Sequence, residues 1–176
     1  MVELKYAAVI LAGYLLGAIP FGMLISRLAK GIDIRRYGSG KIGATNVIRT
    51  VGGKAALISM LLDVAKGSLA VLFAWLVLHT HAAQVAAAAA AVVGHNWSVY
   101  IRFQGGRGVA VFVGSLFAMY WPVGLATGAV VLGLGALTRY MSLGSIVGIA
   151  TAIVAMLVLV LTDKQPSEYL VYSGAV

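Results

Sequence analysis

Two glycine-rich segments carry the residues whose types and spacing could do chemistry. The first, from Gly38 to Arg49, reads GSGKIGATNVIR. Its glycines allow backbone N–H groups to turn towards one point and form a concavity for an anion, and the final arginine offers a planar fork that suits phosphate. The residue types fit equally well a flexible loop whose basic side chains face anionic lipid headgroups. The predicted phosphate-handling residues of this segment are Gly38, Ser39, Gly40, Gly43, Thr45, Asn46 and Arg49.

The second segment, from Gly94 to Gly108, reads GHNWSVYIRFQGGRG. Three of its glycines surround Arg107 immediately before an apolar stretch, where a helix N-terminus would present free N–H groups to a phosphate. His95 could act as a base or a ligand, although a structural hydrogen bond is the default. Trp97 and Tyr100 are typical of the aromatic belt at a membrane interface. The predicted binding residues here are His95, Gly105, Gly106, Arg107 and Gly108.

Asp63 and Lys66 are ionisable residues three positions apart in an otherwise apolar stretch. On a helix this spacing puts them on one face, where each can neutralise the other. Ionisable residues inside a membrane are costly and are usually functional. We favour a buried structural ion pair, with a proton or ion pathway as the alternative.

Several other chemistries lack their residues. The chain has no cysteine and five acidic residues, and it has no G-x-S-x-G nucleophile motif. Its histidines offer no metal-ligand spacing beyond His79 and His81. We therefore expect no metal and no cofactor, and a site built from backbone N–H groups, hydroxyls and arginines.

The elements that must position this site are membrane helices. The chain is 61% hydrophobic and 10% charged, whereas a soluble domain is roughly 45–50% apolar and about 25% charged. A soluble fold of 176 residues could not bury so much apolar surface, but lipid can accept it. The sequence predicts an all-α fold, a polytopic integral membrane helix bundle that forms one domain over residues 1–176.

Apolar runs give the expected course of the chain. They predict helices at about 4–28, 54–78, 82–94, 109–120, 122–137 and 142–161, a turn at Trp121-Pro122, and the start of a seventh helix at 169–176. Pro20 should kink the first helix, in which Gly13 and Gly17 permit close packing. The alanine-rich third helix should pack inside the bundle. Loops are expected at about 29–53, 95–108 and 138–142.

The charges predict an orientation. With alternating crossings the three loops share one side, which holds most lysines and arginines. The other side receives Glu3, Lys5, His79, His81, Asp163, Lys164 and Glu168. The positive-inside rule then places the loops in the cytoplasm and the N-terminus outside. Topology explains most of the net charge of +8, so nucleic acid is not an expected partner.

The motifs resemble those of the bacterial acyl-phosphate:glycerol-3-phosphate acyltransferases, the PlsY family. The matches come in family order and cover nearly the whole chain. They are Gly38 to Gly40, Gly43 to Val47, Arg49, Asp63, Lys66-Gly67, Gly94-His95, Gly105-Gly106, Gly108 to Ala110, Ser142-Leu143 and Ser145-Ile146.

The resemblance implies a seven-helix enzyme of the bacterial inner membrane whose site faces the cytoplasm. Such an enzyme transfers a fatty acyl group from acyl phosphate to the 1-hydroxyl of glycerol 3-phosphate, and it releases lysophosphatidic acid and phosphate. The resemblance implies Ser39, Arg49 and Arg107 as catalytic residues, and it adds Ser142 and Ser145 to the binding residues. Arg49 would anchor glycerol 3-phosphate, and Arg107 with its glycine loop would hold the acyl-phosphate headgroup.

This chain departs from the family pattern at several positions. Lys41 stands where asparagine is usual, and Gln104 and Arg107 stand where lysines are common. The family also continues past its seventh helix into a stretch whose His and Asn help to form the site. That stretch would follow Val176, so we expect a C-terminally truncated member. The alternatives are a small transporter of a phosphorylated anion and a non-catalytic lipid-binding fragment.

Overall fold

The computed structural model describes residues 1–162, and these residues form helices joined by short links. In chain order the elements are α1 (Val2–Ala18), α2 (Phe21–Lys30), the 3-10 turn η1 (Ile34–Arg36), α3 (Ala44–Thr50), α4 (Gly53–Leu78), α5 (His81–Asn96), the 3-10 turn η2 (Val99–Ile101), α6 (Val109–Met119), α7 (Trp121–Thr138) and α8 (Met141–Leu161). Residues 1–162 contain no strand, so the all-α prediction is confirmed. The expected seventh helix at 169–176 and the charges Asp163, Lys164 and Glu168 lie outside the described residues.

Within residues 1–162, four stretches are long and apolar enough to cross a membrane: Val2–Lys30, Gly53–Leu78, Trp121–Thr138 and Met141–Leu161. The two remaining helices that were expected to cross are shorter, with 16 residues in α5 and 11 in α6. Both helices are largely enclosed by their neighbours, so they need not match the thickness of the lipid. Ala83, Ala87, Ala88 and Ala91 of α5 are fully buried, so this helix packs inside the bundle as the sequence predicted.

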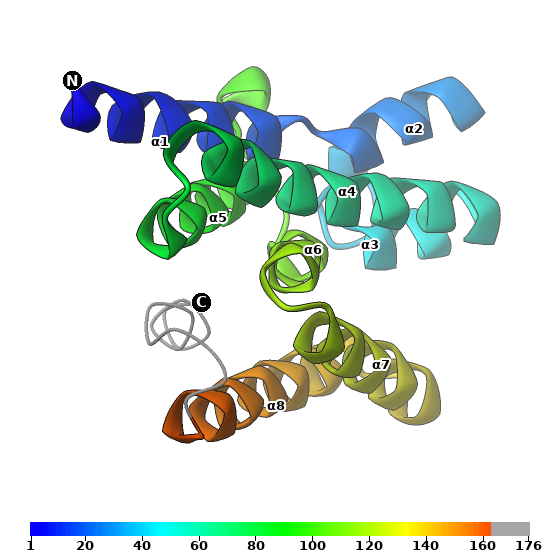
Figure 1. Cartoon of the computed structure of the whole chain (residues 1–176). Coiled ribbons are helices and arrows are strands. Elements are labelled where there is room, and N and C mark those ends of the chain that lie inside the picture. Colours follow the sequence, from blue (N-terminus) through cyan, green and yellow to red (C-terminus); the bar gives the residue numbers. More distant parts are fainter. Residues whose placement is uncertain (163–176) are drawn as a thin grey trace.

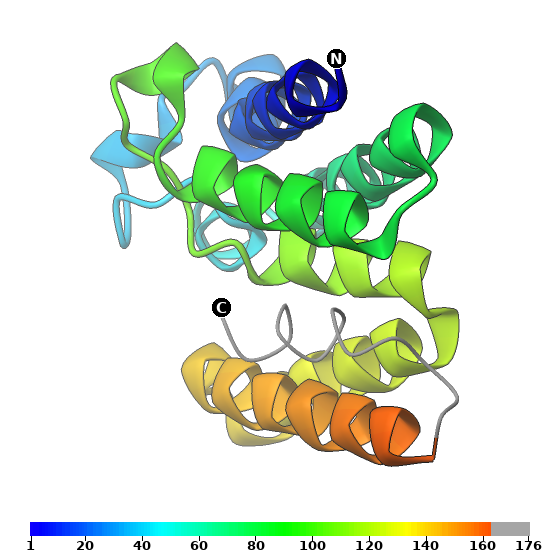
Figure 2. The same ribbon diagram turned by 60° about the vertical axis from the view of Figure 1, so that its left-hand side comes forward.

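α6 separates two groups of helices (Figures 1 and 2). On one side α1 packs on α5 and α4, and on the other side α7 pairs with α8. The main core lies where these groups meet, around Phe112, Leu116, Ala88, Val71 and Met156. A smaller core lies beneath the first loop and contains Met23, Ile34, Ile42, Val47, Ala55, Ala56 and Ile101. This second core holds the loop against the end of the bundle.

The first predicted helix is broken at Pro20, and not only kinked. α1 ends at Ala18, and Ile19 has the extended backbone that a residue before proline prefers, with ψ at 118°. The break turns two backbone carbonyl groups away from the helix. Ser98 Oγ donates to the carbonyl of Ala18 at 2.5 Å, and Lys66 Nζ donates to that of Ile19 at 2.7 Å.

The predicted loop boundaries need two corrections. The segment 29–53 contains the helix Ala44–Thr50, so Thr45, Asn46 and Arg49 stand on a helix and not in a loop. The link between α7 and α8 is only residues 139–140, which places Ser142 inside α8. The expected turn at Trp121-Pro122 lies one residue earlier, at Tyr120. Proline is well suited to the first turn of α7, because the missing N–H would have no helical partner there.

Glycines set the helix spacing, as predicted for the first helix. A Cβ added to Gly17 would overlap the carbonyl oxygen of Ala91 on α5. The same holds between α4 and α6, where a Cβ on Gly67 would meet the carbonyl of Val111. Backbones therefore touch directly at both interfaces, the usual means by which membrane helices gain packing energy.

The Gly17→Ala variant should loosen the α1–α5 interface. Overpacking a tight contact costs about 1–3 kcal/mol, so the melting temperature in detergent should fall by several degrees. Gly133→Ala on α7 is the matched control, because nothing lies within 4 Å of the added Cβ. Equal melting temperatures for the two variants would contradict the close contact.

Candidate functional site

A cavity of about 380 Å³ opens where the three predicted loops converge. Its wall includes α3 with the preceding loop, the start of α6, and the α7–α8 link. The predicted site residues that line it are Ser39, Gly43, Thr45, Asn46, Arg49, His95, Arg107, Gly108, Ser142 and Ser145. Gly38, Gly40, Gly105 and Gly106 do not line it.

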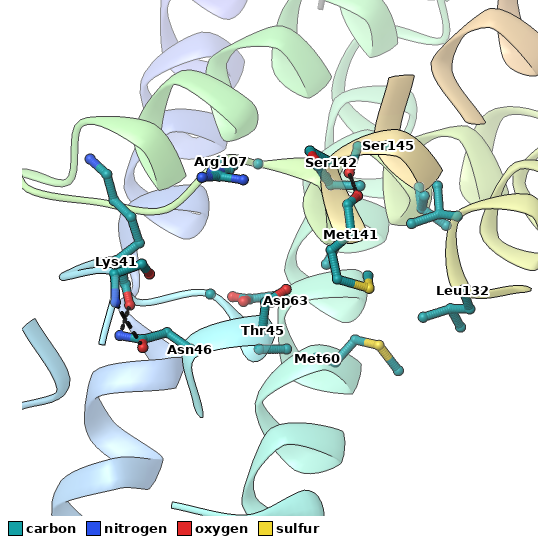
Figure 3. Close-up of a pocket in the computed structure, with 18 of the residues that line it drawn as sticks. Lys41, Thr45, Asn46, Met60, Asp63, Arg107, Leu132, Met141, Ser142 and Ser145 are labelled. Atoms are coloured by element: carbon teal, nitrogen blue, oxygen red, sulfur yellow. Dashed lines mark hydrogen bonds between the residues drawn. The ribbon is translucent and has the colours of Figure 1, made fainter. Parts of the chain in front are cut away.

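The cavity wall is partly polar and partly apolar. Its polar side chains include Ser142 and Ser145 of α8, which lie across from Thr45 and Asp63 (Figure 3). Its apolar side chains come mainly from three helices, α4, α6 and α7, and include Met60, Val64, Val109, Val113, Val131 and Leu132. One cavity thus offers hydrogen-bonding groups and an apolar wall to a single ligand.

Asn46 holds the first loop in shape. It is 2% exposed, and its Nδ2 donates to the carbonyl oxygens of Tyr37 and Lys41, each at 2.9 Å, and more weakly to that of Ile34. Its Oδ1 accepts from the backbone N–H of Ser39 at 3.2 Å. The Asn46 side chain is therefore committed to the loop, although the residue also borders the cavity. Its contribution is to present Ser39.

Two glycines outside the cavity wall help the two loops to adopt their shapes. Gly38 has φ at +56°, a conformation that glycine adopts without strain. A Cβ there would overlap Asn46 Oδ1. Gly106 packs so closely on the His95 ring that a Cβ would overlap Nε2, and its N–H donates to the His95 carbonyl at 3.0 Å. The second loop is thereby fastened to the end of α5, and Arg107 follows at the cavity.

Asp63 and Lys66 form the predicted ion pair, with Lys66 Nζ 2.8 Å from Asp63 Oδ1 and both side chains 2% exposed. The structure adds two features that were not predicted. Lys66 Nζ lies 2.9 Å from His95 Nδ1, and Asp63 borders the cavity. The i to i+3 spacing could reveal the pair, but only the packing of α5 on α4 brings in His95.

Lys41, Arg139, Tyr140 and Met141 also line the cavity and were missed as site residues. The Lys41 side chain extends away from the other labelled groups (Figure 3). Arg139 caps α7 with φ at +62°. The sequence placed Arg139 on the same membrane side as the two loops, and that placement was the available signal.

Arg35 joins the two site loops. It donates through Nε and Nη2 to Asp33, at 2.9 and 2.6 Å to the nearer oxygens, and through Nη1 to the Ile101 carbonyl and Gln104 Oε1 at 3.3 Å each. The hydrogen bond from the Arg35 guanidinium lowers the pKa of Asp33 from 3.8 to about 2. Gln104 faces the Arg35 guanidinium, and a neutral acceptor at this position avoids a repulsive contact.

Comparison with known proteins identifies the family. The profile of the glycerol-3-phosphate acyltransferases matches residues 7–175. This chain belongs to that family. It is 47% identical over 186 aligned residues to "Glycerol-3-phosphate acyltransferase 3" of Dehalococcoides mccartyi, an alignment that covers 98% of this chain and 86% of the relative. It is 48% identical to "Glycerol-3-phosphate acyltransferase" of Cereibacter sphaeroides over 84% of this chain and 70% of the relative.

Two solved structures share the fold. Crystal structures of PlsY (YgiH), an integral membrane glycerol 3-phosphate acyltransferase, superpose with TM-scores of 0.85 for the glycerol 3-phosphate form and 0.84 for the lysophosphatidic acid form. Sequence identities are 35% and 34%, and each comparison covers 97% of this chain and 83% of the other. The predicted PlsY-type membrane fold is confirmed, and so is the predicted enzyme class, a glycerol-3-phosphate acyltransferase of phospholipid synthesis.

The Arg35→Met variant should loosen the contact between the two loops. Loss of its hydrogen bonds, worth about 1 kcal/mol in sum at this partly exposed site, should raise amide hydrogen exchange in residues 99–104 about fivefold. Arg36→Met removes the same charge from an exposed neighbour, and it should leave exchange unchanged. Equal exchange in both variants would contradict the role of Arg35 in joining the two loops.

The pKa of Asp33 sets the pH dependence of the Asp33–Arg35 contact that holds the two loops together. Because the pKa of the folded form is lowered to about 2, the stabilisation is fully present above the ordinary value of 3.8 and disappears as the pH falls towards 2. The difference in exchange between wild type and Arg35→Met should therefore be constant around neutral pH. A difference that changes across the neutral range would point to another titrating group.

Proposed function

We propose that the cavity is where a fatty acyl group passes from acyl phosphate to the 1-hydroxyl of glycerol 3-phosphate, giving lysophosphatidic acid and inorganic phosphate. The observation that carries this proposal is that cationic groups, hydroxyl groups and apolar side chains line the same cavity. Both substrates carry a phosphate and one carries a lipid chain, so the cavity matches the pair in polarity.

The free arginines support the placing of the phosphates. Within residues 1–162, Arg49 and Arg107 border the cavity and make no ion pair or hydrogen bond with the protein. Their guanidinium groups are therefore available to a ligand, unlike that of Arg35. We assign Arg49 to glycerol 3-phosphate and Arg107 to the acyl-phosphate headgroup.

The N-terminus of α6 supports the second assignment. Gly108 is the N-cap and provides no side chain to cap the helix, so the first N–H groups are left without a side-chain partner. Gly108, Val109 and Ala110 border the cavity next to Arg107. A phosphate there would gain from these N–H groups and from the positive end of the helix. Ser39, presented by Asn46, would supply a hydroxyl from the opposite loop.

The acyl chain would extend along the apolar wall between α4, α6 and α7. In the reaction the 1-hydroxyl oxygen forms a bond to the acyl carbon while the bond from that carbon to the phosphate oxygen breaks. The departing phosphate takes the hydroxyl proton. Phosphate is a good leaving group, so positioning and stabilisation of developing charge can supply most of the catalysis.

The proposed location is the bacterial inner membrane, with the N-terminus outside and the cavity facing the cytoplasm. The three segments that meet at the cavity carry Lys41, Arg49, Arg107 and Arg139. The same segments and the end of α2 carry further basic residues: Arg27, Lys30, Arg35, Arg36 and Arg102. Such an excess is typical of the cytoplasmic side.

The direct test uses purified protein with radiolabelled glycerol 3-phosphate and palmitoyl phosphate. Labelled lysophosphatidic acid is the expected product, with one phosphate released per acyl transfer. Labelled glycerol 3-phosphate that enters liposomes without acylation would instead indicate a transporter. Absence of both reactions would contradict the proposal for this chain.

The Arg49→Ala variant should raise the KM for glycerol 3-phosphate by ten- to a hundredfold, because a charge-assisted hydrogen bond is worth about 1.5–3 kcal/mol. The KM for palmitoyl phosphate should change far less. Arg36→Ala, at an exposed position outside the cavity, is the control for loss of charge. An unchanged KM for glycerol 3-phosphate would remove Arg49 from this role.

A further inference from the structure

The buried ammonium group of Lys66 is enclosed by acceptors from three helices or their ends. Nζ lies 2.8 Å from Asp63 Oδ1 on α4, 2.7 Å from the Ile19 carbonyl beyond α1, and 2.9 Å from His95 Nδ1 on α5. The Phe21 ring adds its face at 5.6 Å. A charged lysine has three N–H donors and no acceptor. Lys66 uses them in hydrogen bonds with the Ile19 carbonyl and His95 Nδ1, and its charge is paired with the Asp63 carboxylate.

This arrangement determines the protonation of His95. Because Lys66 only donates, His95 Nδ1 must be the acceptor and cannot carry a proton of its own. The reverse assignment, a neutral lysine beside a charged imidazole, is disfavoured. An amine holds its proton more firmly than an imidazole does in water, and the Asp63 carboxylate lies closer to Lys66 than to His95, at 2.8 against 3.6 Å.

The other ring nitrogen lies at the second loop. The His95 side chain is 4% exposed and borders the cavity, and its Nε2 lies against Gly106, one residue before Arg107. Nε2 has no hydrogen-bond partner among residues 1–162. A neutral imidazole with Nδ1 unprotonated must carry its proton on Nε2. The ring therefore offers one N–H donor and no base next to the proposed acyl-phosphate position.

We propose that Lys66 fixes His95 as the neutral tautomer with its proton on Nε2, and that this N–H donates to a phosphate oxygen of the substrate in the cavity. The proposal rests on the proposed function and deepens it. Lys66 is a positioning residue that acts through His95, and Asp63 balances its charge. His95 contacts the substrate as a donor and takes no proton from the attacking hydroxyl, which is consistent with phosphate as the proton acceptor.

The first test is nuclear magnetic resonance of the full chain with 15N-labelled histidine. Loss of signals in His95→Gln assigns His95, and His79 and His81 at the other end of α4 and α5 give reference signals. The expected spectrum at neutral pH has an unprotonated Nδ1 and a protonated Nε2, and glycerol 3-phosphate with inorganic phosphate should shift Nε2. A proton on Nδ1, or on both nitrogens, would overturn the proposal, as would an unmoved Nε2 signal at saturating ligand.

The role of Lys66 needs a variant that keeps the fold. Lys66→Met alone leaves the Asp63 carboxylate buried without a partner, so the double variant Asp63→Leu with Lys66→Met removes both charges together. We expect it to fold, to show a mixture of His95 tautomers, and to lose kcat with little change in the KM for glycerol 3-phosphate. A His95 spectrum identical to wild type would overturn the positioning role.

Two substitutions of His95 separate a donor from a base. A glutamine amide can place an N–H near the position of Nε2, whereas an asparagine amide reaches only the position of Nδ1. His95→Asn should therefore lower kcat/KM at least about tenfold further than His95→Gln. Equal losses in the two variants would overturn the donor role. If wild type makes no lysophosphatidic acid, the proposed function fails, whereas the tautomer is still decided by the spectrum.

Discussion

The structure depends most on the need to satisfy one buried positive charge. Lys66 is 2% exposed inside an apolar helix, where an unpaired ammonium would be prohibitively costly. Its ion-pair partner Asp63 is on α4, and its two hydrogen-bond acceptors come from α5 and from the chain break after α1. The charge thereby couples the relative positions of these helices. The break at Pro20 contributes directly, because it turns the Ile19 carbonyl towards the lysine.

The cationic side chains at this end of the bundle fall into two groups, those bonded within the protein and those at the cavity. Some are engaged within the protein: Lys66 with Asp63 and His95, Arg35 with Asp33 and the second loop, and Lys30 with the Thr50 carbonyl at 2.8 Å. Arg49 and Arg107 border the cavity without such partners in the described part of the chain. The engaged cations connect helices and loops, and they leave a small set of charges for an anionic ligand. Charge count alone would not separate these two uses.

Close backbone contact makes this arrangement possible. Gly17 lets α1 approach α5, and Gly67 lets α4 approach α6. These interfaces bring the start of α6 and the end of α5 beside α4, so that Arg107, His95 and Asp63 meet at one cavity. The pair α7 and α8 then closes the apolar side with Val131 and Leu132. The polar and apolar residues of the cavity wall therefore come together because of how the two helix groups pack.

By itself, the sequence determined the class of the molecule: its membrane character, most helix positions, the two glycine-rich segments and the Asp63–Lys66 pair. These follow from composition, local periodicity and short spacings, which the chain carries without reference to its fold. The sequence also supplied the family, because the motifs recur in order. Only the tertiary structure decided which glycines shape loops and which border the cavity. It also showed that the Asn46 side chain forms its hydrogen bonds within its own loop. It alone joined His95 to Lys66 across 29 positions. The physical reason is that hydrogen-bond partners and burial are set by which helices touch, and those contacts link residues whose separation leaves no periodic signal.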